Sequence, residues 1–385
     1  MSDRYDAVVV GAGPAGSMTA YRLARAGASV LLLDRARFPR DKPCGGGLTI
    51  RAVRQLPFSV DPVVEDVVDC VELGVGYKRR YERPSPEPLI LMTQRSRLDA
   101  YLAQRASEAG AEFRDGTKVL QVEADDRGVV VDGIRADVVI GADGANGVTA
   151  RALGLCAQPA YGVALEGNLS HDVVDADRYR GRIVLEIGTV RGGYGWVFCK
   201  GDHVNVGVGG WDSEGPRLRE HLHRLCTAYG LPEERLQGLR GFRLPIARPR
   251  ARLARHRALV VGDAAGLVDP FSGDGMHEAF LSARLASETV LDLLAGRASD
   301  LAAYEARLNS ELAFQLEVSW SAKVALDRFP RALFELARTA TIQRGLQKLA
   351  RGELQPDASR CRSRAGRRAL RLLGRGGPRL VPISA

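Results

Sequence analysis

The sequence has few of the residues that build metal sites and disulfide frameworks, and it lacks long apolar runs. Its six cysteines are scattered through 385 residues without a CxxC pair, so neither a metal site nor a disulfide-stapled fold is expected. None of the six histidines falls in a metal or triad arrangement, and the absence of GxSxG argues against a serine hydrolase. No run of eighteen apolar residues occurs, which excludes a membrane-spanning helix. No basic-then-apolar leader follows Met1, so we expect a cytoplasmic protein.

The formal net charge of +9 is concentrated at one end of the chain. Residues 338–385 contain twelve basic and two acidic residues, whereas the rest of the chain carries 43 basic and 44 acidic residues. No aromatic residue follows position 334, which argues against nucleic-acid binding by this tail because bases stack on aromatic side chains. Between residues 360 and 373, arginines alternate with leucines and alanines. This pattern is typical of a basic helix on an anionic membrane, and a solvated arginine-rich helix is the alternative.

The first thirty-four residues have the pattern of a βαβ unit. A buried strand is predicted at 7–11, a helix at 14–26 and a second buried strand at 29–34. The motif Gly-Ala-Gly-Pro-Ala-Gly at 11–16 joins the first strand to the helix, and Asp34 ends the second strand. This context predicts a dinucleotide site, and a glycine-rich packing turn is the alternative.

Each residue of this motif has a distinct physical task. Gly11 makes the tight turn, Gly13 leaves room for a pyrophosphate, and Gly16 lets the helix lie close to the strand. The helix N-terminus attracts the phosphate charge, and Asp34 can accept hydrogen bonds from ribose hydroxyls.

A second pattern identifies the dinucleotide. Asp263 follows the buried strand predicted at 257–262, where its carboxylate can bond a ribityl hydroxyl. The segment Ser-Gly-Asp-Gly-Met at 272–276 then enters a helix predicted at 276–295, and its two glycines allow a flat ring to lie against the backbone. The helix N-terminus would stabilise the negative charge of a reduced flavin. These features together predict FAD.

We therefore predict an α/β chain with a Rossmann-type FAD-binding domain and a second, α+β domain. Strand candidates between 160 and 210 alternate with turn residues and indicate an antiparallel sheet, and the chain is helical in pattern after 302. The predicted division is a discontinuous FAD-binding domain (1–50, 92–155 and 256–300), an antiparallel-sheet substrate domain (51–91 and 156–255) and a C-terminal helical region with the basic tail (301–385).

Several motifs resemble a known group of flavoproteins. GAGPAG (11–16), GADGANG (141–147) and GDAAGLVDPFSGDG (262–275) are similar to the superfamily of aromatic hydroxylases, flavin halogenases and geranylgeranyl reductases. The segments PCGGGL (43–48) and YGWVF (194–198), followed by Gly-x-Gly at 207–209, narrow the resemblance to the geranylgeranyl reductase family over residues 1–300. The resemblance implies an aromatic-hydroxylase-like fold and reduction of isolated double bonds in polyprenyl chains.

The resemblance also implies which residues contact FAD. Arg95 lies in Arg-Ser-Arg-Leu-Asp, which is similar to the family's motif ahead of its helix. Together with the dinucleotide motif, the predicted FAD-binding set is Gly11, Gly13, Ala15, Gly16, Asp34, Arg35, Cys44, Gly45, Gly47, Arg95, Val119, Asp143, Asp263, Gly273, Gly275 and Met276.

An aromatic strand provides a candidate substrate pocket. Tyr194, Trp196 and Phe198 lie on one face because side chains alternate along a strand, and they would form an apolar wall above the flavin, with Gly207 and Gly209 beside them. Simple sheet core is the alternative. Halogenases of the superfamily carry Trp-x-Trp, which the Tyr-x-Trp-x-Phe of this strand does not match.

Cys44 is the candidate catalytic residue. Reduction of an alkene needs a hydride at one carbon and a proton at the other, and Cys44 is expected near the flavin as proton donor or as a residue that shapes the pocket. An inert small side chain is the alternative interpretation. His277 is expected on the helix surface or as a capping residue.

The prediction is an FAD-dependent reductase of double bonds in a geranylgeranyl or polyprenyl chain of a lipid, quinone or related isoprenoid. An FAD-dependent monooxygenase or halogenase of aromatic metabolism is the alternative. No second GxGxxG is present, so the electron donor (NADPH, ferredoxin or another flavoprotein) stays open. Peripheral contact with a membrane through the tail would suit an apolar lipid substrate.

Overall fold

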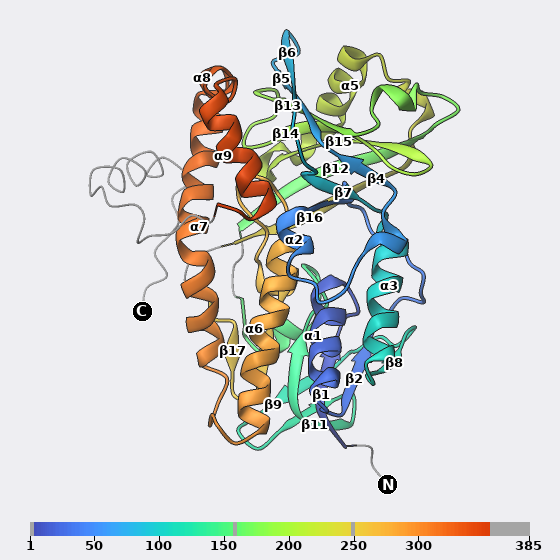
Figure 1. Cartoon of the computed structure of the whole chain (residues 1–385). Helices are drawn as coiled ribbons and strands as arrows, with labels where there is room; N and C mark the ends of the chain where they lie inside the picture. Colours follow the sequence, from blue (N-terminus) through green and yellow to red (C-terminus); the bar gives the residue numbers. More distant parts are fainter. Residues whose placement is uncertain (1–3, 157–159, 248–250, 355–385) are drawn as a thin grey trace, which may run out of the picture.

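The computed structural model describes residues 4–156, 160–247 and 251–354. Figure 1 shows two large sheets, one in the lower and one in the upper part of the molecule, with long helices beside them. The basic segment at 360–373 lies outside the described residues. Within the described ranges, no helix is both long enough and apolar enough to cross a membrane.

The lower sheet has a parallel centre. Its continuous apolar strands are buried on both faces, which is typical of parallel sheets. The path β18-β11-β1-β2-β8 is parallel throughout, and β17, β9 and β10 add antiparallel pairs. The strands are β1 (Arg4–Val10), β2 (Val30–Leu33), β8 (Glu112–Arg114), β9 (Val122–Ala124), β10 (Val129–Val131), β11 (Ile134–Gly141), β17 (Ala254–Arg255) and β18 (Ala258–Val260).

The upper sheet has seven strands in the order β16-β12-β15-β14-β13-β5-β6. All neighbouring pairs are antiparallel except β13 with β5, so the predicted antiparallel sheet is mixed at one point. These two strands come from distant segments that no hairpin joins, which permits a parallel pair. The strands are β5 (Cys70–Val75), β6 (Arg79–Pro84), β12 (Ala160–Ser170), β13 (Arg182–Ile187), β14 (Tyr194–Cys199), β15 (His203–Trp211) and β16 (Gln237–Ile246).

The two faces of the upper sheet have different roles. Val184, Val197 and Val206 point to one face and pack against α5 (Leu218–Tyr229) in a buried cluster. The alternating positions, such as Leu185 and Trp196, point to the other face and line a cavity. One face therefore holds the sheet to its helix, and the other is left for binding.

A third sheet, β3-β7-β4, is formed by β3 (Gly47–Thr49), β4 (Asp66–Val68) and β7 (Ile90–Met92). The strand β3 lies in the segment that joins β2 to α2. Short helical segments follow or connect strands: α2 (Ile50–Val53), α4 (Thr149–Ala152), η1 (Asp61–Val63), η2 (Ala176–Arg178), η3 (Asp212–Arg217), η4 (Glu233–Arg235) and η5 (Gly262–Ala265). The predicted domain division stays a prediction.

The long helices position the cavity. In the lower part of the molecule, α1 (Pro14–Arg25) packs against α3 (Arg95–Glu108) and α6 (Met276–Leu294). Figure 1 shows α7 (Ala303–Arg328) running past both large sheets, with α8 (Pro330–Ala337) and α9 (Ala340–Arg351) beside the upper one. The cavity lies among these elements.

Candidate active site

A cavity of about 1050 Å³ extends from the lower sheet to the C-terminal helices. One end is lined by glycines and charged side chains, and we call it the polar end. The opposite part, the apolar arm, is lined by Val71, Leu73, Tyr81, Ile183, Leu185, Leu326, Leu333, Leu336, Ile342 and Leu346. Of the predicted site residues, all but Gly16 and Gly207 line this cavity.

The glycine turn forms the floor of the polar end. Gly11 has φ +104°, and a Cβ there would lie 2.3 Å from the carbonyl oxygen of Ala142. A Cβ at Gly16 would lie 1.8 Å from the carbonyl oxygen of Gly11, so this position allows α1 to approach β1. Gly13, in contrast, faces the cavity, with only the guanidinium groups of Arg40 and Arg95 among the described residues within 4.0 Å of a Cβ. The N-terminus of α1 therefore opens onto a space bordered by two cations.

Asp34 fixes the backbone of this turn. Its carboxylate accepts hydrogen bonds from the amides of Ala12 (2.8 Å) and Ala36 (2.9 Å), and the residue is 8% exposed. Arg40 lies 3.8 Å from Asp34 and 2.9 Å from Asp99. These contacts hold a charged rim around the space beside α1.

Arg95 is held by a two-point ion pair at the start of α3. Its guanidinium donates to both carboxylate oxygens of Asp99 at 2.7 and 2.8 Å, and both side chains are buried. Burial lowers the pKa of Arg95, but the Asp99 carboxylate outweighs that effect and raises the pKa above its ordinary value. The cation is therefore permanent and fixed in direction.

Asp263 stands at the opposite wall of the polar end, just after β18. The ammonium of Lys42 lies 3.0 Å from its carboxylate. Burial favours the neutral acid, but Lys42 and Arg95 outweigh it and hold the pKa of Asp263 below its ordinary value. Asp263 is therefore ionised at neutral pH and able to accept hydrogen bonds.

Asp143 closes the same wall from the end of β11. One carboxylate oxygen accepts from the amides of Val148 and Thr149 and from the Thr149 hydroxyl, so it caps α4. The other oxygen is buried without a partner among the described residues. It is an acceptor available to a bound molecule.

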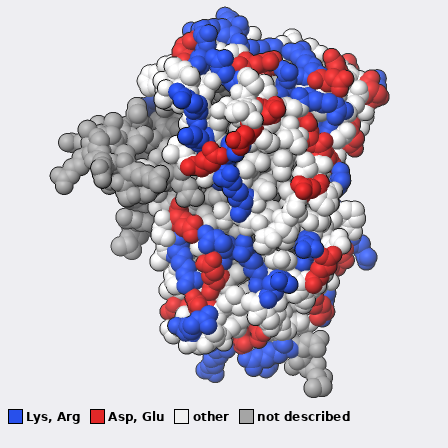
Figure 2. Space-filling model, in the orientation of Figure 1, with Lys and Arg blue, Asp and Glu red and all other residues white. Residues whose placement is uncertain are grey.

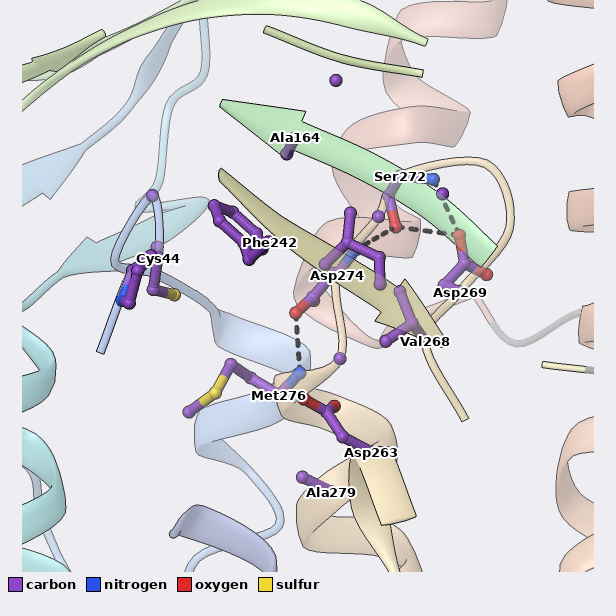
Figure 3. A pocket seen from close by; sticks show the side chains of 18 of the residues that line it. Cys44, Ala164, Phe242, Asp263, Val268, Asp269, Ser272, Asp274, Met276 and Ala279 are labelled. Atoms are coloured by element: carbon purple, nitrogen blue, oxygen red, sulfur yellow. Dashed lines mark hydrogen bonds between the residues drawn. The ribbon is translucent and has the colours of Figure 1, made fainter. Parts of the chain in front are cut away.

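The loop between β18 and α6 surrounds the centre of the cavity (Figure 3). Asp269 accepts from the amides of Phe271 and Ser272, and Asp274 caps α6 through the amide of Met276 at 2.8 Å. Burial, reinforced by the nearby Glu278 carboxylate, raises the pKa of Asp274 to about 6. Its second oxygen has no partner within the part of the chain that the structure describes. The cavity centre therefore contains a carboxyl group whose pKa burial raises above its ordinary value.

The aromatic strand β14 forms the ceiling above this centre. Tyr194, Trp196 and Phe198 all line the cavity. A Cβ at Gly207 would lie 2.2 Å from the Trp196 ring, so Gly207 makes room for the indole instead of lining the cavity. The Trp196 indole N–H donates to Asn205 at 2.7 Å, which satisfies its one polar group and leaves an apolar ring face.

Cys44 lies where the two ends of the cavity meet, and Figure 3 shows its sulfur on the cavity side. Its amide donates to the carboxylate of Glu166 at 2.6 Å, and its carbonyl oxygen accepts from the ammonium of Lys200 at 2.9 Å. Glu166 lies in β12 and Lys200 directly follows β14, and both are buried. Burial raises the pKa of Glu166, an effect that Lys200 partly offsets. Two buried charges thus fix the backbone of Cys44.

Lys323 of α7 also reaches the cavity wall. Its ammonium donates to the carbonyl oxygen of Gly192 and lies 4.3 Å from the centroid of the Trp211 ring. Burial lowers its pKa to about 8, although Asp269 and Asp327 oppose this change. The cavity therefore borders a cation that is only weakly retained above neutral pH.

The sequence analysis missed several residues of this site. Arg40 and Lys42 directly precede the Pro-Cys-Gly motif, and their positive charge beside a predicted dinucleotide site could have indicated them. Asp99 stands four residues after Arg95, which is the spacing of a helical ion pair. No local signal pointed to Glu166 or Lys200, because only the tertiary fold brings them to Cys44.

The expectation for His277 was wrong. His277 is only 5% exposed, because its side of α6 faces the interior of the molecule. Its ring nitrogen lies 3.3 Å from the carboxylate of Glu278. In the ranges 4–156, 160–247 and 251–354, no group of three or more His, Cys, Asp or Glu residues is arranged to hold a metal ion.

The polar end fits the chemistry of FAD. The amide N–H groups at the start of α1, together with Arg40 and Arg95, suit a diphosphate. The carboxylates of Asp263 and Asp143 suit hydroxyl groups, and the glycine-rich loop before α6 leaves space for a flat ring.

Comparison with known proteins agrees with this chemistry. Residues 4–310 match the family model of the FAD binding domain. The chain is 34% identical over 314 residues to the menaquinone reductase of Mycolicibacterium smegmatis, covering 75% of this chain and 76% of the relative. It is 33% identical over 318 residues to the geranylgeranyl diphosphate reductase of Rhodobacter capsulatus, covering 77% and 78%.

Solved structures share the fold. A geranylgeranyl bacteriochlorophyll reductase-like protein from Thermoplasma acidophilum superimposes with a TM-score of 0.75 at 23% identity, covering 84% of this chain and 88% of that one. A flavin-dependent brominase superimposes with a TM-score of 0.77 at 20% identity, covering 97% and 100%. At these identities the likeness shows the fold and nothing finer.

Proposed function

Because this chain belongs to the geranylgeranyl reductase family of FAD-binding flavoproteins, we propose that it reduces carbon–carbon double bonds in a geranylgeranyl or other polyprenyl chain of a lipid or quinone. Membership makes the chain an FAD-dependent oxidoreductase with FAD as its cofactor. The observation that carries the proposed substrate is the apolar arm, which joins the polar end beneath the aromatic ceiling.

The residues of the polar end would hold the cofactor. Gly13 and the N-terminus of α1, with Arg95, would bind the diphosphate, and Asp263 would accept from a ribityl hydroxyl. Gly273 and Gly275 would face the flavin ring across from Cys44. When bound and reduced, FAD supplies the hydride that an alkene needs.

The aromatic ceiling and the apolar arm would hold the isoprenoid. Trp196 and Phe198 present ring faces, and Leu185 of the neighbouring strand continues the same apolar surface. An apolar chain gains free energy by leaving water for such a surface, at about 25 cal/mol per Å² buried. The ceiling also excludes water from the reacting carbons.

A saturated product requires a proton for the second carbon. Cys44 is the candidate donor, because its sulfur borders the cavity and its backbone is fixed by Glu166 and Lys200. Asp274 is a second acid on the cavity wall, and burial raises its pKa, which favours the protonated form that can donate. Either residue would take its proton back from solvent after each turnover.

The second candidate is a monooxygenase or halogenase, because the same fold also occurs in a flavin-dependent brominase. The strand sequence Tyr-x-Trp-x-Phe and the apolar arm both favour the reductase. The basic tail would add membrane contact suited to a lipid substrate.

One experiment separates the two functions. The flavin of the purified holoprotein is reduced chemically without oxygen, and its reoxidation is followed on adding geranylgeranyl-bearing lipids. We expect reoxidation with a gain of two mass units per saturated bond in the lipid. Reoxidation by oxygen alone, with an oxygenated aromatic product, would contradict the proposal and establish the alternative.

A further inference from the structure

The apolar arm opens to the surface between α8 and α9. Leu336 and Leu346 both line the cavity, yet they are 48% and 45% exposed. A side chain that belongs to both the cavity wall and the outer surface marks the rim of an opening. The mouth of the arm is therefore bordered by apolar groups that face water.

Exposed apolar side chains are frequent in the C-terminal helices, two of them at this mouth. Half of the large hydrophobic side chains that are exposed in the described part of the chain fall within residues 329–354: Phe329, Leu336, Leu346 and Leu354. Scattered exposed leucines are ordinary, but a group beside a cavity marks an interaction site.

The helix α9 packs against α2 and α8 and is joined by polar contacts to the segment 84–88. None of its residues is buried. Gln347 and Arg351 donate to the carbonyl oxygens of Pro84 and Pro88, and Arg351 also pairs with Glu87. A helix held this way keeps its apolar side chains available to a partner at the surface.

Positive charge borders the mouth. Arg344 and Lys348 are exposed one helical turn apart on α9, and neither forms an ion pair with a described residue. Figure 2 shows lysine and arginine side chains across the upper part of the molecule, with aspartate and glutamate side chains among them. Residues 355–385 add eight arginines and one aspartate to the chain. The tail would bring like charge against this surface, and so would the same face of a second copy.

We propose that the α8–α9 face, defined by Leu336, Leu346, Arg344 and Lys348, docks on the surface of an anionic lipid bilayer. The two leucines enter the interface, and the two cations lie against lipid headgroups. The mouth of the arm then faces the bilayer, so an isoprenoid chain passes into the cavity without crossing water. The inference rests on the proposed function for the identity of the chain that enters.

Vesicle binding of the full-length holoprotein tests this inference. The probes are vesicles of phosphatidylglycerol with phosphatidylcholine, and of phosphatidylcholine alone. The test variant carries Leu336→Glu and Leu346→Glu. The matched control carries Leu120→Glu and Val130→Glu, which place the same charge on exposed positions (65% and 37%) in the lower part of the molecule. We expect wild type and control to sediment with the anionic vesicles and the test variant to bind at least tenfold more weakly.

A tryptophan at the mouth gives a second, site-specific readout. The chain has three native tryptophans, so wild type sets the baseline. In Leu346→Trp, brominated anionic lipids should quench more fluorescence than they do in wild type, and Leu120→Trp should show no such extra quenching. Equal vesicle binding by the test and control variants would overturn the inference, as would the absence of extra quenching in the Leu346→Trp protein. Dimers that Leu336→Glu/Leu346→Glu dissociates in sedimentation velocity would overturn it too, and would assign the face to a second copy.

The readouts separate this inference from the proposed function. Docking is measured without turnover, and the mass gain of the lipid is measured with detergent-dispersed substrate. Docking without any lipid reduction would remove the proposed function and leave the surface assignment. Reduction of detergent-dispersed lipid by a protein that does not bind vesicles would support the proposed function and remove the surface assignment.

Discussion

The polar end and the apolar arm of the cavity are stabilised by different forces. The polar end is organised by buried charged side chains. Arg95 and Asp99, for example, hold each other in place through two hydrogen bonds. The arm is lined mainly by leucine, isoleucine and valine side chains. On one side, these side chains come from α8 and α9. Directional contacts tolerate little substitution, whereas apolar walls accept changes of shape. The cofactor is therefore specified more strictly than the substrate.

The largest expected effect comes from breaking the charge pair of the polar end. Arg95→Met leaves the fully buried Asp99 with Arg40 as its one cationic partner among the described residues. Removing one member of a buried ion pair costs about 3–5 kcal/mol of unfolding free energy. Urea denaturation should show this loss. The matched control is Arg105→Met on the same helix, whose partner Glu108 is exposed, and it should cost about 1 kcal/mol or less. Similar losses in both variants would contradict the comparison.

A more local change at the polar end should affect the cofactor alone. Asp263→Ala removes a charged acceptor, and such hydrogen bonds contribute about 1.5–3 kcal/mol, so FAD affinity should fall by about 10- to 100-fold. The affinity is measured by flavin titration of the apoprotein. Lys42→Met removes the ion-pair partner and keeps the acceptor, so it should lose less. Full retention of FAD by Asp263→Ala would refute the assignment.

A change in the apolar arm should spare FAD. In Leu185→Trp, the larger side chain occupies part of the arm next to Trp196. A long isoprenoid should therefore bind less well than a short one. The ratio of kcat/KM for geranylgeranyl over geranyl substrates should fall about tenfold, a difference of about 1.4 kcal/mol. FAD affinity of the same variant is the internal control. A uniform loss for both substrates would indicate a folding defect and not a shortened arm.

The smallest effect concerns Lys323, which lies between the two ends. Its pKa of about 8 in the folded chain is below the ordinary value of 10.5, because burial disfavours the cation. The unfolded chain therefore binds more protons between these values, and the free energy of unfolding should rise with pH from 8 to 10.5. Urea unfolding of wild type and Lys323→Met across this range measures the effect. A parallel pH profile in both proteins would show that Lys323 does not contribute.

The sequence predicted local features better than contacts between distant segments. The βαβ unit follows from apolar periodicity and the glycine spacing, both of which act within a short stretch of chain, and the structure places β1, α1 and β2 close to the expected ranges. Cofactor chemistry was readable for the same reason.

Contacts between distant segments could not be predicted in this way. The parallel pair of β13 with β5 joins residues that are far apart in the sequence. Glu166 and Lys200 reach Cys44 across 122 and 156 positions. Their types suggested solvated charges, and only the folded chain shows that both are buried. His277 was misplaced for a related reason, because the side of α6 that faces the interior depends on the packing of other helices.

The fixed backbone of Cys44 has a mechanical consequence. Cys44 precedes β3, and its two partners belong to the upper sheet and to the β14–β15 turn. The loop that carries Cys44 therefore links the lower and upper parts of the molecule through hydrogen bonds. Any motion that spreads the halves apart must first expose two buried charged groups, which makes such a motion rare. Motion of α9, which has no buried residue, meets much less resistance. We therefore expect internal motion to be largest at α9, and the spacing between the loop before α6 and the aromatic ceiling to change little.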